Sequence, residues 1–436
     1  MSIFLVGASP LYGHVNPLLA IGRDLVARGD RVIVLTGSRF RDAAEAAGLE
    51  FHPLTGPADF DERDPSTFVP DQDRYRGIAL SQYQIENTFL RHIPPQWRGL
   101  KALMDAEPID AVLIDSFFAG ALPLLQQPRT SRPPVAAVGI SPLTQLSVDA
   151  PLPNSRIPMM RGPIGRLRNR LLMVAAEKVL FAHAQRLTAS MLAEVGAGRP
   201  SGFVVDFSRL PELYLQLGPR EFDYPRRDLS DNVRFVGPLP ARSSLTEAAL
   251  PDWWDELRDG RPVVHVTQGT LDNHDFGNLV RPTLDGLADL DVHVVVSTGR
   301  APITSVGRVP ANARVAEFLP YDQLLPLTDV FVTNGGSGGM WAALTAGVPL
   351  VVAGDAEDKP EVAARVQYFG VGLDLRTGHP SAAAVRTAVT RVLHDGSFRA
   401  RAGEMRDAIA GYDAFGSIRA ELDALVATRT GQSRVS

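Results

Sequence analysis

VFVTNGGSGGMWAALTAGVPLVVA, residues 330–353, is the segment most informative about the fold. It predicts a strand over Val330–Thr333, a glycine-rich turn, a helix to about Ala346 and a second strand over Leu350–Ala353. Both strands are short and mainly apolar, as parallel strands covered on both faces are. A strand, a helix and a strand in this order indicate a parallel α/β sheet.

The same alternation extends from this unit in both directions. It predicts short strands at 3–6, 31–35, 49–53, 111–114, 135–138, 263–267 and 292–297. A polar segment punctuated by prolines separates the two series. We therefore predict an α/β fold of two doubly wound, Rossmann-like domains, with its site in the cleft between them. The expected boundaries are 1–216 for the first domain, 217–255 for a linker, 256–402 for the second domain and 403–436 for a C-terminal helical segment that packs back on the first.

Two stretches of the first domain interrupt the alternation. Residues 56–98 and 140–163 are long, rich in proline and aromatic residues, and poorly periodic. Long irregular stretches in compact domains are usually functional, so we expect them to wall a hydrophobic substrate cleft, with surface decoration as the alternative. A long helical stretch is expected from about Gly165 to Val195.

Composition excludes several classes of protein. The chain has 436 residues and no cysteine, which excludes thiol nucleophiles and cysteine-ligated metal. With 49 acidic and 44 basic residues the net charge is −5, and with no basic stretch apparent we expect no nucleic-acid partner and no anionic membrane surface. No targeting segment and no membrane span is apparent, which predicts a cytoplasmic protein.

The glycine-rich turn, residues 334–339, is the first candidate for chemistry. Four glycines in five positions let the backbone approach a ligand closely, and the helix N-terminus that follows favours an anion such as a diphosphate. Neither a dinucleotide fingerprint nor a Walker lysine is present. The alternative is a plain flexible turn.

A second candidate pairs His14 with Asp115. His14 lies in Gly13-His14-Val15-Asn16-Pro17 after the first strand, and we expect Asn16 to cap a helix that begins at Pro17. Asp115 ends another strand, so it is placed to orient the ring of a histidine that acts as a general base. The alternatives are a histidine that bonds the loop backbone and an ordinary capping aspartate.

The acidic segment Gly354–Glu361 follows a strand and opens a helix. Its carboxylates suit sugar hydroxyls, but from the residues alone a helix-capping role is favoured.

Together these motifs resemble the inverting, family 1 glycosyltransferases of the two-domain GT-B fold, and within them the bacterial macrolide and natural-product branch. The resemblance covers essentially the whole chain, and Phe318 to Val366 is its most specific part. It implies that His14 is the general base and Asp115 its orienting carboxylate. It implies a donor site made of Thr270, Phe318, Leu319, Asn334, Gly335, Gly336, Ser337, Gly338, Gly339, Asp358 and Lys359.

The resemblance also implies a role for each donor-site position. Thr270 falls where a hydroxyl contacts the donor phosphate, Phe318 where an aromatic ring stacks on the base, and Leu319 where the backbone reads the base edge. Asp358 and Lys359 align with the acidic–amide pair that grips the sugar hydroxyls.

The chain departs from the family at three of these positions and at Ala342. Asn334 replaces the usual histidine, Gly339 a serine or threonine, Ala342 a glutamate expected to hold the ribose, and Lys359 an amide. An asparagine-headed loop of this kind is similar to an actinobacterial subgroup that includes glucosyltransferases acting on ansamycin antibiotics.

The resemblance implies transfer of a hexose, with glucose favoured, from UDP-sugar to a hydroxyl of a hydrophobic natural product such as a polyketide, macrolide or ansamycin. We expect neither cofactor nor metal. The alternatives are a dTDP-deoxysugar transferase, a sugar-nucleotide epimerase of this fold, and a non-catalytic sugar-nucleotide-binding auxiliary protein.

Overall fold

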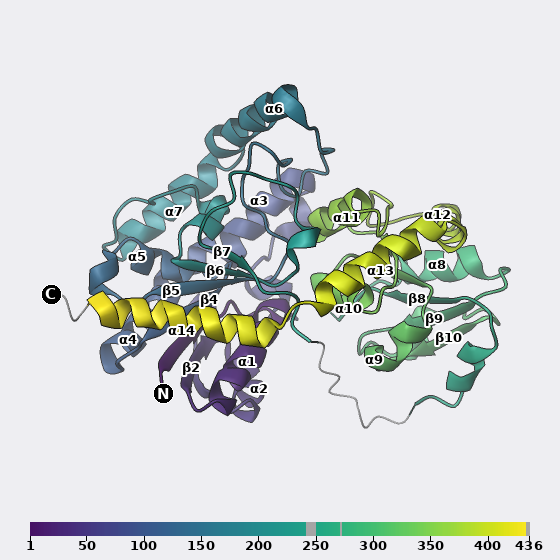
Figure 1. Cartoon of the computed structure of the whole chain (residues 1–436), viewed down its shortest axis with the longest axis horizontal. Helices are drawn as coiled ribbons and strands as arrows, with labels where there is room; N and C mark the ends of the chain where they lie inside the picture. The colour runs from purple at the N-terminus through teal and green to yellow at the C-terminus, as the bar shows by residue number, and fades with distance from the viewer. Residues whose placement is uncertain (241–249, 271–272, 433–436) are drawn as a thin grey trace.

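The computed structural model describes residues 1–240, 250–270 and 273–432. Two parallel sheets form the centres of two α/β domains (Figure 1). The first sheet has the strand order β3-β2-β1-β4-β5-β6-β7. Its strands are β1 (Ile3–Gly7), β2 (Arg31–Thr36), β3 (Glu50–Pro53), β4 (Ala111–Asp115), β5 (Val135–Gly139), β6 (Leu213–Gln216) and β7 (Val233–Phe235).

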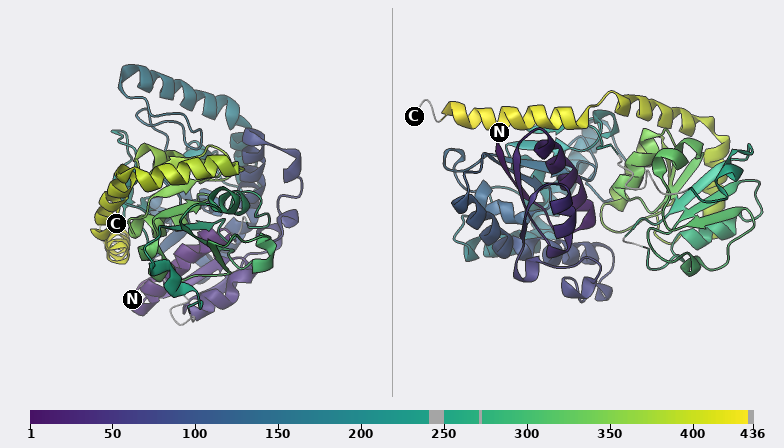
Figure 2. Two further views of the ribbon diagram at one scale, coloured as in Figure 1. Left: turned by 90° about the vertical axis from the view of Figure 1, so that its right-hand side faces the viewer. Right: turned by 90° about the horizontal axis from the view of Figure 1, so that it is seen from below.

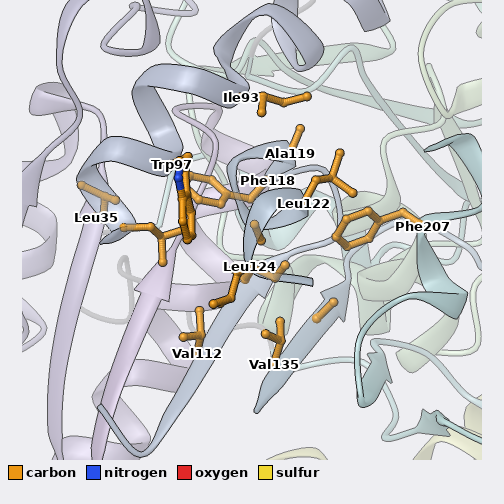
Figure 3. Close-up of a cluster of buried hydrophobic side chains, with 14 of the residues drawn as sticks. Leu35, Ile93, Trp97, Val112, Phe118, Ala119, Leu122, Leu124, Val135 and Phe207 are labelled. Atoms are coloured by element: carbon orange, nitrogen blue, oxygen red, sulfur yellow. The ribbon is translucent and has the colours of Figure 1, made fainter. Parts of the chain in front are cut away.

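Helices cover both faces of this sheet, as the apolar strands require. Alternate residues of β1 point to opposite faces, so Leu5 joins one buried cluster while Phe4 and Val6 join the other. Trp97 and Phe118 pack in the same cluster as Leu5 (Figure 3). The helices of this domain are α1 (Tyr12–Ala27), α2 (Arg41–Ala46), α3 (Gly77–Thr88), α4 (Ile93–Ala106), α5 (Leu122–Leu125), α6 (Gly162–Ala175) and α7 (Ala182–Glu194).

The second sheet has the strand order β10-β9-β8-β11-β12-β13. Its strands are β8 (Val263–Thr267), β9 (His293–Ser297), β10 (Ala313–Ala316), β11 (Val330–Thr333), β12 (Leu350–Val352) and β13 (Gly372–Asp374). Its helices are α8 (Val280–Leu287), α9 (Tyr321–Leu324), α10 (Ser337–Thr345), α11 (Lys359–Tyr368), α12 (Ala382–His394) and α13 (Gly396–Ala410). The βαβ unit predicted from residues 330–353 is therefore present as β11, α10 and β12.

The C-terminal helix α14 (Ala414–Gln432) returns to the first domain (Figure 2). Ile418, Leu422 and Leu425 are buried in the same cluster as Phe4 and Val6 of β1. Burial of this apolar stripe is what holds the helix on the first sheet.

Three expected segments differ in detail from the structure. The proposed linker contains β7, which pairs with β6 and extends the first sheet. Residue 403 lies inside α13, so the returning segment begins at α14. The stretch 56–98 holds α3 and the start of α4, whereas 140–161 contains no helix or strand. None of the described helices is both long and apolar enough to cross a membrane.

Candidate active site

The structure brings His14 and Asp115 into contact at the carboxyl edge of the first sheet. β1 and β4 are adjacent parallel strands, so the segments that follow them meet at one edge. His14 lies in the first turn of α1, just after β1, and Asp115 is the last residue of β4. The ring nitrogen Nδ1 of His14 is 2.9 Å from Oδ1 of Asp115.

Backbone amides fix the Asp115 carboxylate. Its Oδ2 accepts a hydrogen bond from the Ser9 N–H at 2.6 Å, and its Oδ1 accepts one from the Phe117 N–H at 2.7 Å. The side chain is fully buried, and these donors compensate its lost hydration. A carboxylate in this state only accepts hydrogen bonds, so it selects the histidine tautomer that carries its proton on Nδ1. Nε2 of His14 then carries the lone pair that can accept a proton.

The predicted N-cap of this helix is wrong. The helix begins at Tyr12 rather than Pro17, and Asn16 and Pro17 both lie inside it. The Tyr12 N–H is satisfied by Oε2 of Glu62 at 2.7 Å, fifty residues further along the chain. A tertiary contact therefore replaces the local cap, which places His14 on the helix and not in the loop before it.

Glu62 is a site residue that the sequence analysis missed. Its carboxylate is almost fully buried and pairs with Arg39. Burial raises the pKa of Glu62, against the lowering effect of the Tyr12 N–H and Arg39. The only signal was its location in the irregular stretch 56–98.

Aromatic rings flank the His14 imidazole. The ring centroid of Phe117 is 5.4 Å from it, and that of Phe89 is 5.8 Å away. Phe89 comes from the stretch 56–98, so part of that stretch lines the site. This apolar environment limits the access of water to the ring.

The glycine-rich turn connects β11 to α10 at the carboxyl edge of the second sheet. Gly335 has φ of +94°, which disfavours any residue with a side chain, and Gly336 is the residue before the helix. The first N–H groups of α10, from Ser337, Gly338 and Gly339, have no acceptor within the helix. They lie where the sequence predicts an anion-binding helix end, and that role stays a prediction.

Asn334 begins this turn and is almost buried. Its Nδ2 donates to the carbonyl oxygen of Gln268 at 2.8 Å, which ties the turn to the segment after β8. The backbone of Gly354 also packs on the turn, because a Cβ atom there would lie 2.0 Å from the carbonyl oxygen of Asn334. Three loops of the second domain are thereby held together at one edge.

Asp358 connects the two domains. Its Oδ2 accepts a hydrogen bond from Ser337 Oγ at 2.9 Å and another from Ser141 Oγ at 2.6 Å. Ser141 follows β5 of the first domain, so the carboxyl edges of the two sheets face each other at this point. Lys359 is the next residue, and its buried side chain places Nζ 3.3 Å from Oε2 of Glu357.

The remaining donor-site candidates follow β8 and β10. Thr270 is exposed just after β8. Phe318 is 38 % exposed, and the Arg300 guanidinium lies 5.3 Å from its ring centroid. Leu319 is buried, so only its backbone is suited to contact a ligand. Phe318 therefore has a ring face that is partly open for stacking.

A buried ionic cluster also joins the domains, and the sequence analysis missed its members except Glu361. Arg365 of α11 donates to Oδ1 of Asp223 at 2.9 Å, to Oε1 of Glu361 at 3.0 Å and to the carbonyl oxygen of Leu143 at 2.7 Å. Oε2 of Glu361 accepts the Asn154 N–H at 2.8 Å. Leu143 and Asn154 belong to the stretch 140–163, so this stretch contacts α11 of the second domain. Its role as a wall of a substrate cleft stays a prediction.

Comparison with known proteins gives the family context. Residues 281–423 match the family described as "Erythromycin biosynthesis protein CIII-like, C-terminal domain". The chain is 35 % identical to UDP-glycosyltransferase 2 of Phaeomoniella chlamydospora, over 97 % of this chain and 95 % of that protein. It is 38 % identical to 4'-demethylrebeccamycin synthase of Lentzea aerocolonigenes, over 94 % of this chain and 96 % of that protein.

Solved structures share the architecture. The calicheamicin glycosyltransferase CalG4 superposes with a TM-score of 0.73, covering 98 % of both chains at 22 % identity. At this level of identity the match establishes the fold alone.

Proposed function

Because the chain belongs to the UDP-glycosyltransferase family and has its GT-B fold, we propose that it transfers a hexose, in the first place glucose, from a UDP-sugar to a hydroxyl of a hydrophobic natural product. The acceptor class we propose is a polyketide, macrolide or ansamycin. The observation that carries the proposal is the pair formed by His14 and Asp115, since it has the geometry of an oriented general base.

The proposed reaction is a single displacement. Nε2 of His14 removes the proton of the acceptor hydroxyl while that oxygen attacks the anomeric carbon of the donor. The bond from the anomeric carbon to the diphosphate oxygen breaks, and the nucleoside diphosphate leaves with the electron pair. Attack from the opposite face inverts the configuration, so an α-linked donor gives a β-glycoside.

Asp115 supports the histidine in this scheme. As the ring gains a proton on Nε2 it becomes an imidazolium, and the carboxylate 2.9 Å from Nδ1 stabilises that charge. The N–H groups at the start of α10 and the Thr270 hydroxyl are proposed to stabilise the negative charge that develops on the diphosphate. Asp358 is proposed to position the sugar hydroxyls, with Ser141 and Ser337 holding its carboxylate.

The first test is a thermal-shift titration with UDP and with dTDP in the absence of acceptor. Ligand at about 100 times its Kd adds about 2.7 kcal/mol of stability and raises Tm by several degrees. We expect the larger shift with UDP. A larger shift with dTDP would favour a deoxysugar donor, and no shift with either would contradict the proposed donor site.

The second test separates chemistry from binding. His14→Ala is expected to lower kcat about 10²- to 10⁴-fold, the usual contribution of a general base, while the UDP-induced thermal shift is retained. His379→Ala, at an exposed position of the second domain, is the matched control and keeps full activity. Full glycosyl transfer by His14→Ala would refute the assigned base.

A further inference from the structure

The helix α6 presents its apolar residues to solvent. Among the described residues, six of the thirteen exposed large hydrophobic side chains lie between positions 160 and 179. Within α6 itself Ile164 is 76 % exposed, Leu167 59 %, Leu171 63 % and Val174 52 %. The buried residues of this helix are Gly165 and Asn169, neither of which has a large apolar side chain. The helix is therefore turned with its apolar side away from the protein.

The exposed residues form one continuous stripe. Their spacing of three, four and three residues places them on a single face of an α-helix. The opposite face is anchored, because Asn169 Nδ2 donates to the carbonyl oxygen of Val148 at 2.9 Å and Arg166 pairs with Asp149 at 2.9 Å. The helix lies at the edge of the molecule, away from both sheets (Figures 1 and 2). This anchoring fixes the orientation of the stripe toward solvent.

The charged residues of α6 itself have one sign, since Arg166, Arg168 and Arg170 are its only ionic side chains. Residues 150–176 contain five arginines and no aspartate or glutamate, although the whole chain has a net charge of −5. At 100° per residue, Arg168 and Arg170 lie on opposite sides of the apolar stripe. The whole-chain charge therefore conceals this local excess of arginine, which the expectation from pI and net charge did not take into account.

We propose that α6 is a peripheral membrane-docking helix, which lays its apolar stripe into the surface of a bilayer that contains anionic phospholipid. The apolar stripe would contact the acyl chains of such a bilayer, and the arginines on either side of the stripe would contact its anionic headgroups. A second copy of this chain is a poorer occupant, because α6 packed on α6 would bring arginines against arginines. The helix docks and does not span, since its 14 residues measure about 21 Å.

Vesicle flotation of the full chain tests the proposal. Phosphatidylcholine vesicles with and without phosphatidylglycerol are compared at low and high salt. We expect flotation with the anionic vesicles that weakens at high salt, because headgroup attraction is screened. The double variant Leu167→Glu/Leu171→Glu is expected to lower the partition coefficient at least 100-fold, since each exposed leucine loses its burial in the acyl layer.

Two further variants give controls. Ile303→Glu/Val309→Glu changes exposed apolar residues of the second domain and is expected to float like the unchanged chain. Arg170→Gln keeps the stripe and is expected to lower partition into anionic vesicles about fivefold. All these positions are exposed, so matching thermal melting curves check that every variant is folded.

Three outcomes would overturn the proposal. The first is a full chain that stays with the soluble fraction at every salt and lipid composition. The second is a Leu167→Glu/Leu171→Glu variant that is folded and still floats. The third is a dimer, measured by sedimentation equilibrium, that this double variant converts to a monomer, because a second copy would then occupy the stripe.

Discussion

At the scale of single residues, the two nitrogens of the His14 ring have different tasks. Nδ1 is committed to Asp115, and Nε2 is left to accept a proton. Asp115 in turn depends on backbone donors from Ser9 and Phe117. The orientation of the base is thus built from the strand ends of β1 and β4 and does not rely on a mobile side chain.

Asp115→Asn tests this arrangement. The amide oxygen can replace Oδ1, but the amide nitrogen then faces the buried Ser9 N–H, which loses its acceptor. We expect a loss of about 1–3 kcal/mol in the free energy of unfolding, measured by urea titration. We also expect kcat to fall about 10²-fold or more, because the imidazolium is no longer stabilised.

Asp110→Asn is the matched control for the structural part of this effect. Asp110 accepts the Ile3 N–H at 2.8 Å, so it holds β1 by the same kind of bond without contacting His14. A rotated amide at position 110 can still present its oxygen to the Ile3 N–H, so this variant is expected to lose less stability than Asp115→Asn and to retain kcat. An Asp115→Asn enzyme with unchanged kcat would show that the carboxylate has a structural role only.

At the scale of elements, β8 carries a buried histidine that makes folding sensitive to pH. His265 is fully buried, with Nδ1 2.9 Å from the carbonyl oxygen of Val295 and Nε2 3.2 Å from the Tyr321 hydroxyl. Burial lowers the pKa of His265 to about 4. The folded protein therefore keeps this ring neutral at pH values where the unfolded chain protonates it.

Protonation of His265 in the unfolded chain makes the protein less stable at low pH. Between the unfolded pKa of about 6.5 and the folded pKa of about 4, the unfolded chain binds more protons, so stability falls as the pH falls through this window. The contribution of His265 is about 3 kcal/mol, fully lost below pH 4. His265→Gln should show a shallower loss of stability from pH 7 to pH 4 in urea titrations.

His379→Gln, at an exposed position, is the control and should leave the slope unchanged. An equal slope for His265→Gln and the unchanged protein would contradict the assignment.

The start of α1 shows where local sequence signals fail. Asn16 and Pro17 are good residues for a helix start, and both are inside the helix. The Tyr12 N–H receives its acceptor from Glu62. A cap supplied from fifty residues away has no local pattern, so reasoning from neighbours along the chain placed the boundary too late.

At the scale of the whole molecule, the two domains are joined by buried charge. Arg365 bridges Asp223 and Glu361, and it also donates to the backbone carbonyl of Leu143 in the first domain. Tyr224 covers the guanidinium, which lies 4.3 Å from its ring centroid. The cluster lies at α11, directly after Asp358, so the same contacts position the donor-site edge relative to the first sheet.

Arg365→Met is expected to lower the free energy of unfolding by about 3–5 kcal/mol, because buried Glu361 loses its cation, whereas Asp223 keeps Arg220 and Arg226. Arg386→Met removes an exposed ion pair with Asp289 and should cost less than about 1 kcal/mol. Urea titration of both variants measures the difference. Equal losses would mean that the buried cluster does not hold the domains together.

The pattern of residues along the chain was enough to predict the architecture and to pick out the candidate reactive side chains. Apolar periodicity predicted two parallel α/β domains and a C-terminal segment that returns to the first domain, because burial of apolar residues follows from their spacing. The ends of those strands predicted that His14 and Asp115 meet, since parallel strands present their carboxyl ends at one edge. The roles of the donor-site residues stay predictions.

Contacts between residues far apart along the chain became apparent only in the folded protein. Glu62 completes α1, Ser141 reaches Asp358, and Arg365 joins the domains. The outward direction of the stripe on α6 belongs here too, since an apolar period does not say which side faces the protein. Such contacts depend on how the formed helices and strands pack against each other. Hydrogen bonds between residues far apart in the chain produce no periodic pattern or fixed spacing in the sequence.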